Sequence, residues 1–168
     1  MYERAVKDKI NFQFTTNFSL LEMVRTSKKV DNWPKDTDVI WYLHHLCWYV
    51  LQPIRNHYGR PVRVSSGYRS KELNELIGGS LKSQHSFGMA ADFEVPGIDN
   101  REIAKWINSN LSYDQLILEF YKSKSGKSSG WVHCSYKPTG RRKQFLTAKK
   151  TGQRTIYLPA TLSSIDKL

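Results

Sequence analysis

Three segments in the second half of the chain alternate apolar and polar side chains, and this alternation limits the folds that the chain can adopt. They are residues 88–95 (GMAADFEV), 115–121 (QLILEFY) and 131–137 (WVHCSYK). Successive side chains of a β-strand point to opposite faces, so each segment has one apolar face and one mixed face. Because KSKSGKSSG joins the last two segments, we expect a hairpin with a long, mobile connection.

Helical periodicity predicts the layer that covers this sheet. Residues 38–56 carry an apolar stripe at steps of three and four, with Pro53 expected to kink the last turn. Further helices are expected at 18–30, at 70–77 and after a capping box that begins at Asp99. The predicted fold class is α+β, a small antiparallel sheet packed with helices.

The length of 168 residues suits one domain. We expect a core over about residues 18–137 and a basic C-terminal extension over 138–168. That extension contains a possible strand at 155–158, and otherwise we interpret it as a solvated basic face.

The charge of the chain indicates an anionic partner. There are 26 Lys and Arg against 15 Asp and Glu, a formal net charge of +11. Nucleic acid, an anionic membrane face and the acidic polymers of a cell envelope all fit this charge. The apolar and aromatic content excludes a disordered chain.

Other features bear on location. Neither of the two cysteines, Cys47 and Cys134, belongs to a CxxC pair or a disulfide framework, so we expect reduced thiols. The N-terminus lacks the pattern of a secretory signal, which predicts synthesis in the cytoplasm without a signal peptide. The longest uncharged stretch, 39–54, is too short for a membrane span. We expect a monomer.

The residues that carry chemistry follow from strand phase. Asp92, Glu119 and His133 fall on the mixed faces of the three predicted strands, away from the core. His85 precedes Asp92 in a loop rich in small residues, where a metal ion can approach the backbone closely. Cys134 points to the opposite face from its neighbour His133, so we expect it to pack as a small apolar group rather than bind metal.

Two imidazoles and one carboxylate, with one position left for water, make up the ligand set of a catalytic zinc site. Glu119 would then be the base that takes a proton from the water, and the hydroxide would attack an amide or ester carbonyl. Each residue taken singly has a structural alternative: a loop histidine, a strand-edge aspartate, or a salt bridge between Glu119 and a lysine. Their joint placement on one sheet face favours the metal site.

Three motifs resemble a known family. They are SSGYRS at 65–70, SQHSFGMAAD at 83–92 and WVHCS at 131–135. These segments are similar to the zinc D-Ala-D-Ala carboxypeptidase-like peptidases, called the M15 peptidases, whose fold is shared by the N-terminal signalling domain of hedgehog proteins. The resemblance covers roughly residues 18–137. A basic, single-domain member without a secretory signal pattern suggests a phage-type enzyme.

The resemblance implies roles for particular residues. It implies zinc bound by His85, Asp92 and His133, with Glu119 as general base. Arg69 of the Gly-Tyr-Arg motif would hold and polarise the scissile carbonyl or its oxyanion. Ser83, two residues before the ligand histidine, matches a position that contacts substrate. The chain departs from some members in the long separation of Glu119 from His133, which leaves Glu94 as a competitor for the role of base.

The leading hypothesis is a zinc-dependent peptidoglycan peptidase that cleaves beside a D-amino acid in cell-wall stem peptides, as a phage lysin does. The positive charge would hold it to anionic wall polymers, either after release from the cell or on a virion. Whether it acts as an endopeptidase or a carboxypeptidase stays open. One alternative is a non-catalytic, zinc-containing module that binds cell wall or belongs to a phage structure. Nucleic-acid binding is not expected, because no stacking motif or reading helix is present.

Overall fold

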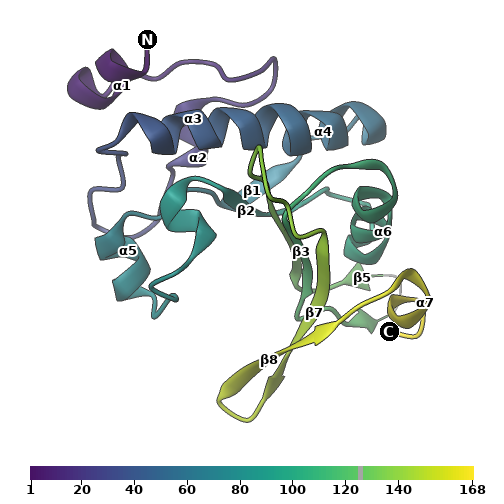
Figure 1. Ribbon diagram of the computed structural model, residues 1–168. Coiled ribbons are helices and arrows are strands. Elements are labelled where there is room, and N and C mark those ends of the chain that lie inside the picture. Colours follow the sequence, from purple (N-terminus) through teal and green to yellow (C-terminus); the bar gives the residue numbers. More distant parts are fainter. Residues whose placement is uncertain (125–126) are drawn as a thin grey trace.

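The computed structural model describes residues 1–124 and 127–168 (Figure 1). Its centre is a six-stranded sheet in the order β1-β2-β6-β3-β7-β8. The strands are β1 (Arg63–Ser66), β2 (Ala90–Glu94), β3 (Gln115–Glu119), β6 (Trp131–Ser135), β7 (Gln144–Thr151) and β8 (Arg154–Pro159). This arrangement confirms the α+β class.

The sheet is mixed and larger than expected. Neighbouring strands are antiparallel except β3 and β7, which run parallel. The end of β6 lies beside the start of β3, so the chain passes that end of β3 and enters β7 in the same direction. The expectation of a wholly antiparallel sheet is corrected on this point.

The basic segment after residue 138 contributes β7, β8 and the short helix α7 (Leu162–Ile165). The strand expected at 155–158 lies within β8, whereas β7 was not predicted. Its sequence QFLTAKKT has few apolar residues, but Phe145, Leu146 and Ala148 are all buried. Pairing with the edge of β3 supplies the backbone hydrogen bonds that local sequence does not reveal.

Helices cover one face of the sheet. The stripe predicted over 38–56 is fully buried, in a continuous helical run of α3 (Thr37–Leu46), the π-helical turn η1 (Cys47–Leu51) and α4 (Gln52–Tyr58). Pro53 lacks the N–H of a regular helix; a π-helical turn lies just before it, and α4 continues beyond it to Tyr58. α3 packs against β2, while α6 (Asn100–Asn110) packs against β3 and β6. None of the described helices has the length and apolar character to cross a membrane.

The remaining helices are short. They are α1 (Tyr2–Asp8), α2 (Leu20–Met23), α5 (Lys71–Leu76) and η2, a 3₁₀ turn (Gln84–Phe87). The helix expected over 18–30 is wrong beyond its first turn. Ser19 caps its start, but Asn32 donates to the carbonyl of Val24, an acceptor that a longer helix would use for its own next turn.

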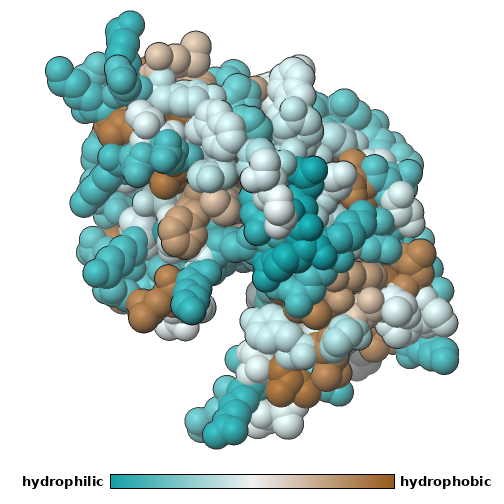
Figure 2. All heavy atoms as spheres, in the orientation of Figure 1, coloured by the Kyte–Doolittle hydropathy of each residue, from teal (hydrophilic) through white to brown (hydrophobic). Residues whose placement is uncertain are grey.

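The two faces of the sheet differ as the alternation predicts. Side chains on the helix-covered face are fully buried: Ala91, Phe93, Leu116, Leu118, Val132 and Cys134. The opposite face, here called the site face, carries Asp92, Glu119 and His133 beside a small apolar cluster of Ile117, Leu146 and Ala148. Figure 2 shows the surface deeply hollowed between the region of α5 and the β7–β8 hairpin.

The hairpin of β3 and β6 is confirmed. Its long connection contains a short antiparallel pair that was not predicted, β4 (Ser123–Lys124) and β5 (Lys127–Ser128). Residues 125–126 of that link lie outside the described residues.

Candidate metal centre and active site

His85 is oriented by a backbone carbonyl. It lies in η2 and is 3% exposed. Its Nδ1–H donates to the carbonyl oxygen of Gly67 at 2.7 Å, because a carbonyl can only accept. The proton on Nδ1 leaves the Nε2 lone pair facing the sheet. Burial lowers the pKa of His85, which favours the neutral imidazole that binds metal ions.

Asp92 and His133 meet His85 across the strands. Asp92 on β2 pairs in register with His133 on β6. The Oδ1 atom of Asp92 lies 2.9 Å from Nδ1 of His133 and 3.3 Å from Nε2 of His85, and the two ring nitrogens are 3.2 Å apart. All three residues are buried, and they form a group able to hold a metal ion.

The size of this triangle fits zinc. A tetrahedral ion with ligands at about 2.0–2.1 Å needs ligand atoms about 3.3 Å apart. The three separations of 2.9, 3.2 and 3.3 Å are close to that edge length. The donor set of two imidazole nitrogens and one carboxylate oxygen also suits the ion, and a single ion could contact all three.

Arg69 holds the other oxygen of Asp92. Its Nη2 lies 2.5 Å from Oδ2, and its Nε donates to Oγ of Ser66 at 2.8 Å. This pair keeps Oδ1 directed toward the histidines. Burial acts to raise the pKa of Asp92, but His85 and His133 outweigh it and hold that pKa well below its usual range. The carboxylate is therefore ionised at neutral pH.

The Gly-Tyr-Arg motif is a tightly packed turn that places both Arg69 and the acceptor for His85. A Cβ on Gly67 would lie 2.3 Å from the carbonyl oxygen of Met23, so only glycine fits. Asn32, which is 6% exposed, donates to the Tyr68 carbonyl and accepts from the Ser70 N–H. Sequence reasoning missed Asn32, because a single asparagine in a loop carries no signal of its own.

Glu119 stands at the end of β3 on the site face, as strand phase predicts. Burial raises its pKa to about 6; the charge of Asp92 adds to this, while His133 and Arg69 oppose it. Within the described residues its carboxylate forms no hydrogen bond or ion pair, so both oxygens are available. The competitor Glu94 is exposed, accepts from Asn100 and does not line this pocket.

The hairpin changes course directly after Glu119. Phe120 has a left-handed φ of 53°, which ends the alternation, and its ring packs edge-on against Trp131 at 5.2 Å. A Cβ on Gly130, whose φ is 76°, would lie 1.9 Å from the Glu119 carbonyl. The strand expected over 115–121 therefore stops at Glu119. The buried indole N–H of Trp131 has no partner among the described residues.

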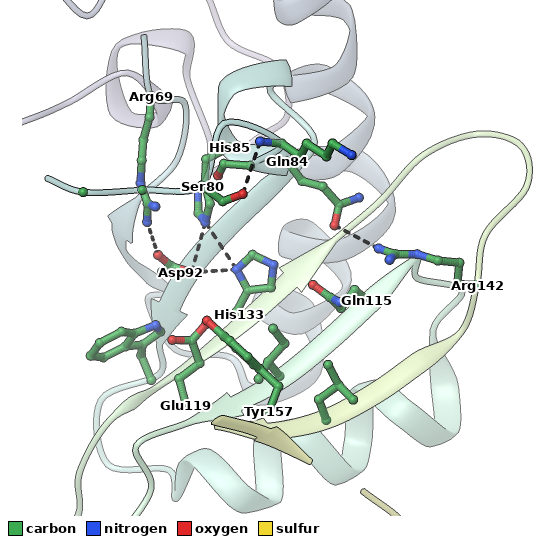
Figure 3. Close-up of a pocket in the computed structure, with 17 residues that line it drawn as sticks. Arg69, Ser80, Gln84, His85, Asp92, Gln115, Glu119, His133, Arg142 and Tyr157 are labelled. Carbon is green, nitrogen blue, oxygen red and sulfur yellow. Dashed lines mark hydrogen bonds and ion pairs between the residues drawn. The ribbon is translucent and has the colours of Figure 1, made fainter. Parts of the chain in front are cut away.

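These side chains line one open pocket of about 530 Å³ (Figure 3). Arg69, His85, Asp92, Glu119 and His133 lie along its floor and sides. Ser83, within the loop that follows α5, also lines it, as do Leu146 from β7 and Tyr157 from β8. The pocket therefore brings together every site residue expected from the sequence.

A sheet face with two histidines and an aspartate around one point, beside an unpaired glutamate, defines a metal-binding α+β protein with the groups needed for hydrolysis. The chain belongs to the Peptidase M15 family, whose model matches residues 14–135. This match confirms the resemblance drawn from the motifs. M15 peptidases are zinc enzymes, and the chain is accordingly a peptidase with a candidate metal site. A comparison with curated proteins returns no match.

Proposed function

We propose that the protein is a zinc-dependent peptidoglycan peptidase that hydrolyses a peptide bond beside a D-amino acid in cell-wall stem peptides. The observation that carries this proposal is the triangle of His85, Asp92 and His133 with Glu119 in the same pocket. Family membership supports the peptidase chemistry. The identities of the metal ion and of the substrate are proposed in addition to what family membership shows.

In this proposal His85, Asp92 and His133 are the zinc ligands. A zinc ion bound there would lower the pKa of water and polarise the scissile carbonyl. Glu119 would accept the proton of the attacking water and pass it to the amine of the leaving group. The pKa of Glu119, raised to about 6, suits both steps. At neutral pH the carboxylate form predominates and can accept the proton of the water, and the raised pKa helps the resulting carboxylic acid to hold that proton until it passes to the amine.

Arg69 and Ser83 would contact the substrate. Arg69 uses Nε and Nη2 within the protein, whereas its Nη1 forms no hydrogen bond in the described part of the chain. Those free N–H groups could hold the scissile carbonyl or stabilise its oxyanion. Ser83 lines the wall of the pocket, where its hydroxyl could bind the peptide.

The charge of the chain supports a wall substrate. An enzyme of net charge +11 would adhere to anionic wall polymers through long-range attraction. We infer a lysin-like role, at the bacterial cell wall after release or on a virion. The electrostatic part of this proposal predicts binding to purified walls that weakens as salt rises.

The test compares Glu119→Gln with Glu94→Gln, a matched loss of one carboxylate outside the pocket. Each variant and the parent are incubated with purified peptidoglycan and zinc, and released fragments are identified by mass spectrometry. We expect parent and Glu94→Gln to release the same stem-peptide fragments, and Glu119→Gln to release none above background. Equal release by both variants would remove Glu119 from the mechanism, and no release by the parent would favour the alternative of a non-catalytic zinc module.

A further inference from the structure

A second charged cluster lies at one end of the same pocket, and two of its residues, Lys137 and Arg142, lie outside the segment that the family matches. Asp114, directly before β3, is fully buried. Arg142, just before β7, donates to it three times: from its backbone N–H at 2.9 Å, from Nε at 3.0 Å and from Nη2 at 2.5 Å. Lys137 adds an ion pair at 3.4 Å. Two cations thus surround one buried carboxylate.

Gln84 ties this cluster to the metal site. It directly precedes His85, donates to Asp114 at 2.9 Å and accepts from Nη2 of Arg142 at 3.3 Å. Burial acts to raise the pKa of Asp114, but the bonds from Arg142 and Gln84 lower it to about 2. Asp114 therefore stays charged and fixes the guanidinium of Arg142 in one position. Figure 3 shows Arg142 directed toward Gln84, on the far side of His133 from Arg69.

Part of the Arg142 guanidinium is not used in these contacts. Nε and Nη2 are engaged within the protein, while Nη1 forms no hydrogen bond among the described residues. The side chain of Arg142 is 48% exposed and lines the pocket together with Lys82 and Gln115. A fixed arginine with two free N–H groups is a binding group for a carboxylate.

We propose that Arg142 is the anchor of a carboxylate-binding subsite, which selects peptides that bear a free carboxylate near the scissile bond. The inference rests on the proposed function and deepens it by naming the class of substrate. Asp114 and Gln84 are positioning residues in this subsite, since they act through Arg142.

Strand geometry limits how far from the cut this carboxylate can be. Asp114 lies three residues before Ile117, and Ile117 pairs with His133 in the sheet. At about 3.4 Å per residue this is about 10 Å along the strand, no more than about three residues of extended substrate. Two carboxylates meet that limit: the C-terminal carboxylate of a short stem peptide, and the side-chain or α-carboxylate of a residue within the stem.

The experiment uses three peptides of one sequence, taken from the stem-peptide fragment that the zinc-loaded enzyme acts on. The first has all carboxylates free, the second has a C-terminal amide, and the third has its internal carboxylates amidated. We expect one of the two amides to lose about 10- to 100-fold in kcat/KM, mostly through KM, as for a lost charged hydrogen bond. The amidated peptide whose kcat/KM falls identifies which carboxylate of the substrate binds the subsite.

Variants of Arg142 show whether that preference belongs to this residue. In Arg142→Gln the preference for the free carboxylate over the amide, taken as the ratio of the two kcat/KM values, should fall to about onefold. Arg142→Lys, which keeps the charge without the planar fork and retains a partner for Asp114, should keep only part of the preference. Arg141→Gln is the matched control, because Arg141 lies over Tyr136 and outside this pocket.

Failure of the inference is distinct from failure of the proposed function. Equal hydrolysis of all three peptides by the parent, or an undiminished preference in Arg142→Gln, would overturn the subsite while leaving the peptidase intact. If the parent hydrolyses none of them, calorimetric binding to the Glu119→Gln protein decides. The subsite would be supported if the free-acid peptide binds more tightly than the amidated peptides and if this difference disappears in the double variant Glu119→Gln/Arg142→Gln. It would be overturned if the free-acid and amidated peptides bind equally or do not bind.

Discussion

The Nε2 atom of His85 lies 3.2 Å from the Nδ1 atom of His133, although 48 residues separate the two histidines in the chain. Two imidazoles this close, with a carboxylate oxygen against both, indicate a site built for a cation. Neutral imidazole is the form that binds metal, and the hydrogen bond from His85 to Gly67 selects its tautomer. The consequences can be measured on the purified protein.

Metal content tests the ligand set directly. After zinc loading and desalting, we expect the parent to retain about one zinc per chain, and His85→Ala to retain at least about tenfold less, because one of three ligands is gone. Zinc should also raise the Tm of the parent, since an ion that binds only the folded state stabilises it. Elemental analysis and thermal unfolding provide the two readouts.

His57→Ala is the control for this measurement. His57 is exposed and stacks on Trp106 at 4.3 Å, away from the pocket. The His57→Ala protein should bind as much zinc as the parent. A parent that retains no zinc, or a His85→Ala variant that retains as much as the parent, would exclude His85 as a ligand.

Gly67→Ala tests the turn that orients His85. The added Cβ would meet the Met23 carbonyl at 2.3 Å, so the backbone has to shift and carry the Gly67 carbonyl with it. We expect a loss of about 1–3 kcal/mol in the free energy of unfolding. Zinc affinity should fall about 10- to 100-fold, because the partner of a metal-binding histidine is displaced. Urea unfolding and zinc titration measure these effects.

Gly140→Ala separates the contact from simple backbone strain. Gly140 has a φ of 61° with no atom within 4 Å of the added Cβ. Its replacement should cost about 1 kcal/mol and leave zinc affinity unchanged. Equal effects of the two substitutions on zinc binding would show that the Gly67 carbonyl does not position His85.

The pH dependence of activity reports on Glu119. Its pKa is raised to about 6, and only the carboxylate can accept a proton. Activity should therefore fall as pH decreases through about 6. A cation bound nearby favours the carboxylate form of Glu119, so in the metal-loaded enzyme the fall should come at a lower pH. We expect Glu119→Gln to lower kcat/KM by about 10²- to 10⁴-fold and to remove this limb from any residual activity. A parent profile that is flat from pH 7 to pH 4 would contradict the assignment.

Asp114 makes stability depend on pH in the acid range. Its pKa in the folded protein, about 2, lies below the unfolded value of 3.8, so ionised Asp114 stabilises the fold. The contribution is about 2 kcal/mol; it is fully present above about pH 4 and is lost as pH falls toward 2. Asp114→Asn should therefore be less stable than the parent at pH 7, and the difference should narrow below pH 4.

Urea unfolding at pH 7, 4 and 2.5 measures that difference. Asp166→Asn is a control, because the Asp166 carboxylate is half-exposed and pairs with Lys105 at the surface. Its effect should be about 0–1 kcal/mol. An Asp114→Asn variant as stable as the parent at pH 7 would show that the Arg142 cluster does not hold the start of β3.

Local sequence determined the parts of this protein that depend on short-range periodicity. The step of two along a strand is enough to place Asp92, Glu119 and His133 on one face and Cys134 on the other. The stripe over 38–56 predicted the main helix for the same reason. Neither pattern could reveal where the helix at 18–30 ends, because a distant asparagine, Asn32, takes the Val24 carbonyl.

Only the tertiary structure decided which residues lie together across long separations. The parallel pairing of β7 with β3, and hence the burial of Asp114 under Arg142, comes from the path of the chain around one end of the sheet. The choice of Glu119 over Glu94 depends on which carboxylate reaches the pocket: Glu119 lines it, whereas Glu94 is exposed and accepts from Asn100. Side-chain phase is a property of a few consecutive residues, whereas these contacts depend on how whole strands pack.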